Sequence, residues 1–331
     1  MALTGRPRIL ALRALGLGDF LTSVPALRAL RRARPDHELV LAAPATLAPL
    51  ADLAGACDRL ADVSGFAPVP WSGPAPDLAV NLHGRGPQSH RLLRSLGPGA
   101  LVAFGSEEVP HAGPAWVEEE HETRRWCRLL EETLGIPTDP VDLVLRRPVV
   151  PAPAPGAVVI HPGAAYPSRR WPAERFARVA RAVVQAGYDV VLTGGPDETT
   201  LADQVAELAG LPQRAVLAGR TGLDRLAAQV AAARLVICGD TGVAHLASAF
   251  RTPSVVLFGP VSPSRWGPPP DGPHVVIWRG RDEAPGDPWG DAVDPALLRV
   301  EVADVVDRAL ELLEGDLSAP GPVRRTTPGS A

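Results

Sequence analysis

The sequence predicts an α/β protein with two doubly wound domains. Short apolar runs typical of buried strands alternate with helical patterns along the chain, which indicates parallel strands joined by helical crossovers. The alternation stops once, at 148–156, where four of nine residues are proline, and then begins again. At 331 residues the chain has the length of two domains of about 100 to 200 residues each.

The first domain is expected over residues 1–150. Strands are predicted at 8–12, 38–42 and 78–82, because each is a short apolar run followed by a turn and a helical pattern. Pro25 lies early in the helix that follows the first strand, so this helix either begins near Ser23 or is kinked there. A long helix is predicted at 118–134, with its apolar residues on or near one face.

The second domain is expected over residues 156–313. Its strands are predicted at 158–160, 190–192, 215–217, 235–237 and 255–258. Helices are predicted from Glu174 up to Gly187 and at about 197–209, 224–233, 242–249 and 302–313. Residues 315–331 are rich in Pro, Ser, Thr and Gly, and we expect a disordered tail there. In such folds the carboxyl ends of the strands line the ligand site, here a cleft expected between the domains.

Composition narrows the possible locations and partners. Hydrophobic residues make up 46% of the chain and charged residues 21%, and no apolar run approaches the roughly 18 to 20 residues of a membrane span. The first residues lack the pattern of a signal peptide, so we expect a cytoplasmic protein with at most peripheral membrane contact. A net charge of −4 provides no basic surface for nucleic acid, which is excluded as a partner.

Residue usage also excludes several chemistries. All 33 basic residues are arginine, so Schiff-base and Walker-type lysine chemistry are impossible. Cys57, Cys127 and Cys238 are far apart in the chain, which predicts reduced thiols with neither a disulfide framework nor a zinc site. No Asp-x-Asp pair is present to hold a divalent cation against a diphosphate, so neither a metal nor a cofactor is expected.

Residues 239–245 are the strongest candidate for an anion site. They read Gly-Asp-Thr-Gly-Val-Ala-His and join the apolar run at 235–237 to an alanine-rich helix. The first N–H groups of such a helix lack partners and lie at the positive end of its dipole, which favours a phosphate. Equally, Asp240 or Thr241 could cap the helix with no ligand bound. Both interpretations remain open on this stretch alone.

Three loops of the second domain could converge on one ligand: 161–171, 193–198 and 239–245. Arg169 and Arg170 could hold a phosphate through paired hydrogen bonds, or they could be a solvated arginine pair. Glu198 could accept hydrogen bonds from ribose hydroxyls, or it could only complement a helix dipole. This convergence favours a nucleotide site.

The first domain has an acidic turn at Gly16-Leu17-Gly18-Asp19. A dinucleotide-binding fingerprint would require a third glycine at position 21, where this chain has Leu21. A dinucleotide-dependent dehydrogenase or epimerase therefore becomes a minor alternative.

Taken together, these motifs resemble those of glycosyltransferase family 9, to which the ADP-heptose:lipopolysaccharide heptosyltransferases belong. The resemblance keeps motif order up to about residue 313 and is carried by Gly18-Asp19 with Pro25, His161-Pro162-Gly163 with Arg169-Arg170-Trp171-Pro172, Thr193-Gly194-Gly195-Pro196-Asp197-Glu198, Gly239-Asp240-Thr241-Gly242 with His245, and Phe258-Gly259-Pro260 with Arg265-Trp266-Gly267-Pro268. It implies a GT-B fold of two Rossmann-like domains and transfer of a sugar, possibly heptose from ADP-heptose, from a nucleotide diphosphate to a glycan or glycolipid. It further implies inversion at the anomeric carbon and no metal. A non-catalytic sugar-nucleotide binding protein is the main alternative.

The resemblance also implies roles for individual residues. Asp19 would be the general base, and Arg169 would stabilise the departing diphosphate at a position where family members usually have lysine. The residues expected around the sugar donor are Glu198, Asp240, Thr241, Gly242, Val243 and His245. Of these, Asp240 is expected to shape the loop, and His245 could either reach the sugar donor or bond a nearby carbonyl. Arg85 and Gly18 are the candidates for the acceptor side.

Overall fold

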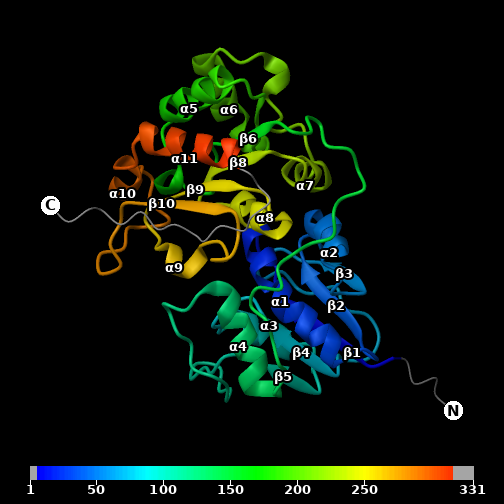
Figure 1. The fold of residues 1–331 in the computed structure, drawn as a ribbon. Coiled ribbons are helices and arrows are strands. Elements are labelled where there is room, and N and C mark those ends of the chain that lie inside the picture. Colours follow the sequence, from blue (N-terminus) through cyan, green and yellow to red (C-terminus); the bar gives the residue numbers. More distant parts are fainter. Residues whose placement is uncertain (1–5, 316–331) are drawn as a thin grey trace. The chain divides into compact units, whose positions relative to one another are not determined.

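The computed structural model describes residues 6–315, so residues 316–331 of the expected tail lie outside the described part. The chain divides into two compact units between Arg146 and Arg147, each with its own parallel sheet (Figure 1). No helix within the described residues is long and apolar enough to cross a membrane.

The sheet of unit 1 has five parallel strands in the order β3-β2-β1-β4-β5. Their bounds are β1 Arg8–Leu12, β2 Glu38–Ala43, β3 Arg59–Asp62, β4 Leu78–Asn81 and β5 Ala100–Val102. From β1 the chain first builds toward β3 and then returns to place β4 on the other side of β1. The point where the strand order reverses therefore lies between β1 and β4, which is where doubly wound sheets bind ligands.

Four α-helices accompany this sheet: α1 Leu17–Ala33, α2 Ala48–Ala54, α3 Gln88–Arg94 and α4 Glu122–Leu134. A short 3-10 turn, η1 Ala45–Leu47, precedes α2. Helix α1 begins at Leu17 and runs through Pro25, so the predicted alternative of a start near Ser23 is wrong. Helix α4 begins at Glu122, later than the expected 118, because His121 occupies its N-cap and accepts a hydrogen bond from Thr123 N.

The sheet of unit 2 has the order β10-β9-β8-β6-β7 and is also parallel throughout. Its strands are β6 Val158–His161, β7 Val190–Leu192, β8 Leu235–Gly239, β9 Ser254–Phe258 and β10 His274–Trp278. The order reverses between β6 and β8, which are hydrogen-bonded neighbours. The strands are almost wholly buried, which agrees with their uninterrupted apolar sequences.

The helices of unit 2 are α5 Ala173–Gln185, α6 Thr199–Ala209, α7 Leu223–Ala231, α8 Gly242–Phe250, α9 Pro263–Trp266, α10 Pro295–Leu298 and α11 Val302–Glu314. Three 3-10 turns, η2 Pro167–Arg169, η3 Pro196–Glu198 and η4 Gln213–Ala215, lie among them. The strand expected at 215–217 is wrong, because this stretch forms η4 and then a single bridge from Val216 to Leu192. It lies at the outer edge of the sheet beyond β7, where pairing ends.

The proline-rich stretch is attached to unit 2. Ala154 exchanges two hydrogen bonds with the Gln229 side chain, of 2.7 and 2.8 Å, and Gly156 N donates to Ala232 O. Gln229 is itself fully buried, which anchors the contact. The units divide between Arg146 and Arg147, directly before the proline-rich stretch at 148–156.

Candidate functional site

In unit 2, the candidate residues lie around the reversal point between β6 and β8. His161 ends β6, Gly239 ends β8, and His161 is in register with Cys238. The loops after β6, β7 and β8, which the sequence singled out, all leave the sheet at this carboxyl edge. The parallel topology therefore brings together the three loops expected to share a ligand.

The start of α8 is open to an anion. Thr241 is the N-cap residue with extended backbone angles (φ −153°, ψ 169°), and its side chain makes no capping hydrogen bond. Thr241 and Gly242 are partly exposed, whereas Val243 is buried at the start of the helix. The proposed cap by Thr241 is thus wrong, and its hydroxyl remains available to a ligand at the positive end of the helix dipole.

Asp240 and Arg169 form the charged part of this site. Arg169 Nη1 lies 3.9 Å from Asp240 Oδ2, and both side chains are largely buried. Burial raises the pKa of Asp240 to about 6, opposed by the positive charge of Arg169. Arg169 Nε is buried and has no hydrogen-bond partner among residues 6–315, and the guanidinium lies 5.7 Å from the centre of the Tyr166 ring. A cation with spare donors therefore adjoins the α8 terminus.

A glycine permits this approach. A Cβ atom at Gly239 would lie 3.1 Å from the carbonyl oxygen of Arg169, closer than side chains normally come. The glycine that ends β8 thus allows the 3-10 turn that carries Arg169 to pack against the end of the strand. Arg170, next in sequence, is used differently: its Nε donates to Ala164 O at 2.8 Å and holds the loop after β6.

Glu198 lies in a cluster of local contacts. Its Oε2 accepts a hydrogen bond of 2.7 Å from Gly195 N and lies 3.7 Å from His161 Nε2. His161 Nδ1 in turn lies 3.0 Å from Thr193 Oγ1, and burial lowers the pKa of this histidine while Glu198 raises it. A Cβ at Gly163 would lie 2.1 Å from Glu198 Oε1, so any side chain there would displace the carboxylate. The loops after β6 and β7 thus fix the carboxylate of Glu198.

His245 lies one turn into α8. Its ring packs edge-on against the ring of Trp266, with the ring centres 5.9 Å apart, and the side chain is partly exposed. The loop after β9 therefore contributes an aromatic neighbour to the residues at the start of α8.

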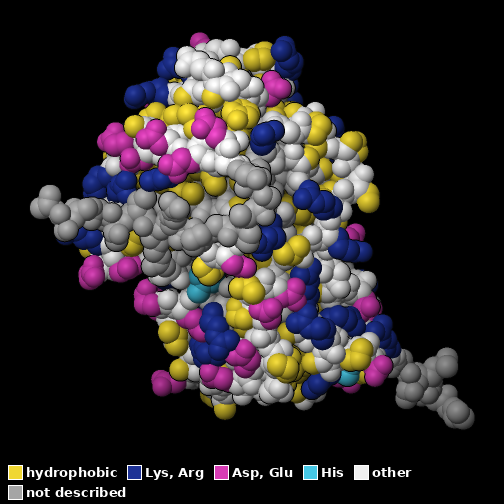
Figure 2. Space-filling view, in the orientation of Figure 1, with side chains coloured by type: hydrophobic (Ala, Val, Ile, Leu, Met, Phe, Trp, Pro, Cys, Tyr) yellow, Lys and Arg dark blue, Asp and Glu magenta, His cyan; other side chains and the backbone are white. Residues whose placement is uncertain are grey.

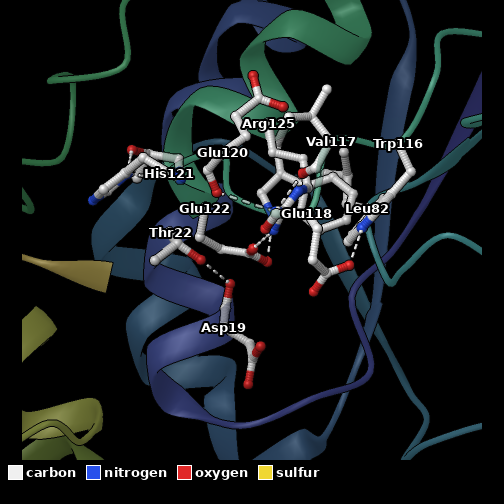
Figure 3. A network of polar contacts seen from close by, with 12 residues as sticks. Asp19, Thr22, Leu82, Trp116, Val117, Glu118, Glu120, His121, Glu122 and Arg125 are labelled. Atoms are coloured by element: carbon white, nitrogen blue, oxygen red, sulfur yellow. Dashed lines mark hydrogen bonds and ion pairs between the residues drawn. The ribbon is translucent and has the colours of Figure 1, made fainter. Parts of the chain in front are cut away.

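In unit 1, Asp19 lies in the first turn of α1, beside the reversal point between β1 and β4. One of its carboxylate oxygens, Oδ1, lies 3.2 Å from Arg13 Nη2, and the side chain keeps about 33% of its surface exposed. Figure 3 shows this carboxylate pointing away from Glu122 and Arg125. Burial raises the pKa of Asp19, Arg13 lowers it, and Glu122 raises it.

Arg13, the first residue after β1, is almost fully buried, with 1% of its surface exposed. Its guanidinium donates to Asp19 O at 2.8 Å, to Leu82 O at 2.6 Å and to Glu122 Oε1 at 2.9 Å. Thr22 Oγ1 lies at 3.3 Å. A buried arginine is tolerated only when its donors are satisfied, and this arrangement satisfies them.

Glu122 completes the network at the start of α4. Its Oε1 also accepts a hydrogen bond of 3.0 Å from Trp126 Nε1, and its Oε2 accepts one from Arg125 Nη1 (Figure 3). Arg125 Nη2 donates to three carbonyl oxygens of the preceding loop, those of residues 117, 118 and 120. The chain thus has a buried Arg-Glu-Arg cluster with Asp19 at its more exposed end.

Comparison with known proteins adds the family. The sequence model of glycosyltransferase family 9 (heptosyltransferase) matches residues 111–285, more than half of the chain. The chain belongs to glycosyltransferase family 9. It is 35% identical over 106 residues to lipopolysaccharide heptosyltransferase 2 of Escherichia coli K12, covering 31% of this chain and 30% of that protein. It is 33% identical over 159 residues to an E. coli lipopolysaccharide heptosyltransferase 3, covering 47% and 46%. The matches span less than half the length of these curated relatives.

Solved structures resemble this family 9 chain over nearly its whole length. The glycosyl transferase family 9 protein of Veillonella parvula has a TM-score of 0.74 at 22% identity, covering 95% of this chain and 99% of its own. The E. coli ADP-heptose LPS heptosyltransferase II has a TM-score of 0.73 at 20% identity, covering 93% and 98%. The E. coli heptosyltransferase WaaC with ADP has a TM-score of 0.69 at 19% identity, covering 92% and 99%. The two Rossmann-like units expected of the GT-B fold are confirmed.

The remaining acceptor-side candidates of the family 9 chain differ in their surroundings. Arg85 follows β4 and is exposed, and Gly18 lies in the first turn of α1. The arginines at 28, 31 and 32 of α1 form ion pairs with the carboxylates of Asp58 and Asp142. On the face drawn in Figure 2, arginine side chains are interspersed with Asp and Glu.

Sequence reasoning missed Arg13 and Glu122. Arg13 directly follows a predicted strand, which was the available signal, whereas nothing near Glu122 in the sequence indicates a partner 109 residues away. His83 directly follows the predicted strand at 78–82, but the sequence does not indicate that its ring packs against that of Phe66, with the ring centres 4.8 Å apart. Within residues 6–315, no three His, Cys, Asp or Glu side chains are grouped closely enough to hold a metal ion.

Proposed function

We propose that this family 9 chain is a glycosyltransferase that moves a sugar from a nucleotide diphosphate to a hydroxyl group of a glycan or glycolipid. Family membership supports the reaction class. The observation that carries the proposal is the α8 terminus, where an N-cap residue without a capping bond adjoins Arg169, whose buried Nε has no hydrogen-bond partner among residues 6–315. Such a site suits the diphosphate of a sugar donor.

The sugar donor would bind to unit 2. The Thr241 hydroxyl and the N–H groups of Gly242 and Val243 would contact the phosphates, Glu198 would meet the ribose, and His245 would lie one helical turn further along. Asp240 would shape the loop without touching phosphate, because its own negative charge would repel that ligand. A relative, heptosyltransferase WaaC of E. coli, was solved with ADP, so ADP-heptose is the first sugar donor to test.

Asp19 would act as the general base. The acceptor hydroxyl oxygen attacks the anomeric carbon, the bond from that carbon to the diphosphate oxygen breaks, and the hydroxyl proton passes to the Asp19 carboxylate. A single displacement of this kind inverts the anomeric centre. The raised pKa of Asp19 supports the assignment, because a base works best when its pKa approaches the working pH.

Charge on the departing diphosphate would be met by Arg169 and the α8 terminus, which together supply the positive potential that a metal ion would otherwise supply. The reaction is therefore proposed to need no metal. Arg85 and Gly18 would lie on the acceptor side, where an arginine suits an anionic sugar or lipid head group. We propose a cytoplasmic enzyme with at most peripheral membrane contact.

Two experiments test this function together. A thermal-shift screen with ADP, GDP, UDP and dTDP should raise the melting temperature with one base preferentially, because a ligand of the folded state stabilises it. Transfer from ADP-heptose should then fall by about 10² to 10⁴ in Asp19→Asn, with nucleotide binding unchanged. Nucleotide binding without turnover by the wild-type protein would indicate a binding module. A shift with NAD and none with nucleoside diphosphates would indicate a dinucleotide enzyme.

A further inference from the structure

The surroundings of Asp19 are more elaborate than a surface carboxylate requires. Arg13 and Glu122 are both almost fully buried, and each makes several hydrogen bonds. Burying these two charges is unfavourable unless their geometry is well satisfied, and a pair of apolar side chains would fill the same space with less penalty. A buried ion pair that ends at a proposed catalytic carboxylate therefore calls for a functional explanation.

Arg13 is fixed independently of the Asp19 carboxylate. The carbonyls of Asp19 and Leu82, the Thr22 hydroxyl and Glu122 Oε1 all lie within hydrogen-bonding distance of its guanidinium. Its contact to Asp19 Oδ1, at 3.2 Å, is longer than its contact to Glu122 Oε1, at 2.9 Å. The cation is thus held mainly by other groups and presents one N–H to Asp19.

Glu122 limits how strongly Arg13 acts on Asp19. Because Glu122 and Asp19 share the Nη2 atom of Arg13, part of the guanidinium charge is already compensated. Trp126 and Arg125 hold the Glu122 carboxylate from the far side and prevent it from turning away. Arg13 therefore orients the carboxylate of Asp19 without fully neutralising its negative charge.

We propose that Arg13 and Glu122 form a positioning pair for Asp19, in which Glu122 fixes the guanidinium and Arg13 orients the carboxylate while leaving it able to accept a proton. This inference rests on the proposed role of Asp19 as the base. Neither residue of the pair needs to touch the substrate, since both act through Asp19.

If the pair acts in this way, removing each member should shift the pKa of Asp19 in opposite directions. Arg13 lowers the pKa of Asp19 and Glu122 raises it. Removing the guanidinium charge in Arg13→Met should raise the pKa, and removing the carboxylate charge in Glu122→Gln should lower it. Another titratable group that Arg13 influences is His83, whose pKa is lowered to about 4 by burial and by Arg13, so it stays neutral above pH 5.

The test measures both ionisation and turnover on the full chain. Carboxyl-carbon NMR titration, with Asp19→Asn to assign the signal, reports the pKa of Asp19 without any need for activity. The acidic limb of the pH profile of kcat/KM should move to higher pH in Arg13→Met and to lower pH in Glu122→Gln. In both variants turnover at pH 7 should fall about tenfold, while the affinity for nucleotide should stay unchanged. Arg13→Lys, which keeps the charge but lacks the fork of donors, should lose turnover with little shift of the limb.

Glu120→Gln is the matched control. Glu120 is a partly buried glutamate two residues before Glu122, and its carboxylate pairs with Arg128 at 2.8 Å. It should leave the pKa of Asp19 and turnover unchanged. Circular dichroism would establish that each variant is folded, and if Arg13→Met does not fold, Arg13→Lys and Glu122→Gln carry the test.

The outcomes separate the two hypotheses. The positioning role would be overturned if the pKa of Asp19 moved in the same direction in Arg13→Met and Glu122→Gln. It would also be overturned if that pKa did not change in a folded Glu122→Gln protein. Full turnover in Asp19→Asn would instead overturn the proposed base, whatever the titrations show.

Discussion

Arg169 Nη1 and Asp240 Oδ2 lie 3.9 Å apart, a separation that leaves the buried carboxylate only partly compensated. The pKa of Asp240 is about 6 because burial outweighs the attraction of Arg169. A group whose pKa is raised on folding stabilises the folded state at low pH, and this stabilisation is lost as the pH rises through its folded pKa. Asp240 should therefore oppose folding above about pH 6.

Asp240→Asn tests this relationship. At pH 7 to 8 the variant should unfold at a higher urea concentration than the wild type. The difference should disappear below about pH 4, where the Asp240 carboxyl of the wild type is as uncharged as the amide that replaces it. ADP should bind several-fold more tightly to the variant at pH 7.5, because a buried negative charge near the phosphates has been removed. Weaker binding would show that Asp240 contacts the ligand directly. Asp224→Asn, in the first turn of α7, is the control.

Arg169→Met should discriminate between phosphate and nucleoside. We expect the affinity for ADP to fall about tenfold to a hundredfold, while adenosine binding stays nearly the same, because only the diphosphate interacts with the guanidinium. Isothermal titration calorimetry with both ligands measures the difference. Arg178→Met, an exposed arginine of α5, should change neither affinity. Equal loss for ADP and adenosine would assign Arg169 a structural role.

Gly163→Ala should disturb Glu198. The added Cβ would lie 2.1 Å from Glu198 Oε1, so the carboxylate must move away from Gly195 N. We expect the free energy of unfolding to fall by about 1 to 3 kcal/mol, as for other overpacked sites, and the affinity for ADP to fall with it. Gly195→Ala is the control, since its Cβ would lie at an ordinary 3.7 Å from the same carboxylate. Equal effects in the two variants would contradict a specific role for the approach at Gly163.

EDTA should leave sugar transfer unchanged. Arg169 and the α8 terminus are proposed to stabilise the leaving diphosphate, so chelation removes nothing that the reaction uses. The measurement is the initial rate of transfer in about 5 to 10 mM EDTA, a concentration that removes weakly held divalent ions. Loss of transfer, with recovery on addition of Mn²⁺, would refute this account of leaving-group stabilisation.

The sequence predicted the strands with continuous apolar runs well, because such runs must be buried on both faces of a parallel sheet. It did not reveal β3 at Arg59–Asp62, β5 at Ala100–Val102 or β10 at His274–Trp278, which lie at sheet edges or carry polar residues. Edge strands pair on one side only, so their sequences carry a weaker pattern. The reversal points, by contrast, follow from strand order, which the sequence does not contain.

The candidate site shows the same division. Local motifs located Asp19, Arg169 and the start of α8, since a turn between strand and helix has a sequence signature. The contact between Arg13 and Glu122 joins residues 109 positions apart, and no local signature accompanies a pairing of that kind. Likewise, the sequence identifies Gly163 as part of a motif, but only the structure shows that a side chain at this position would meet the carboxylate of Glu198.

One side chain in unit 1 joins four elements. Arg13 follows β1, bonds the carbonyl of Leu82 after β4, and reaches Asp19 on α1 and Glu122 on α4. Separating any one of these elements would leave a buried charge without its partner, which raises the free energy of every partly opened form. Unit 1 should therefore unfold as one cooperative block, and the backbone amides around Asp19 should exchange with deuterium only when the whole unit opens.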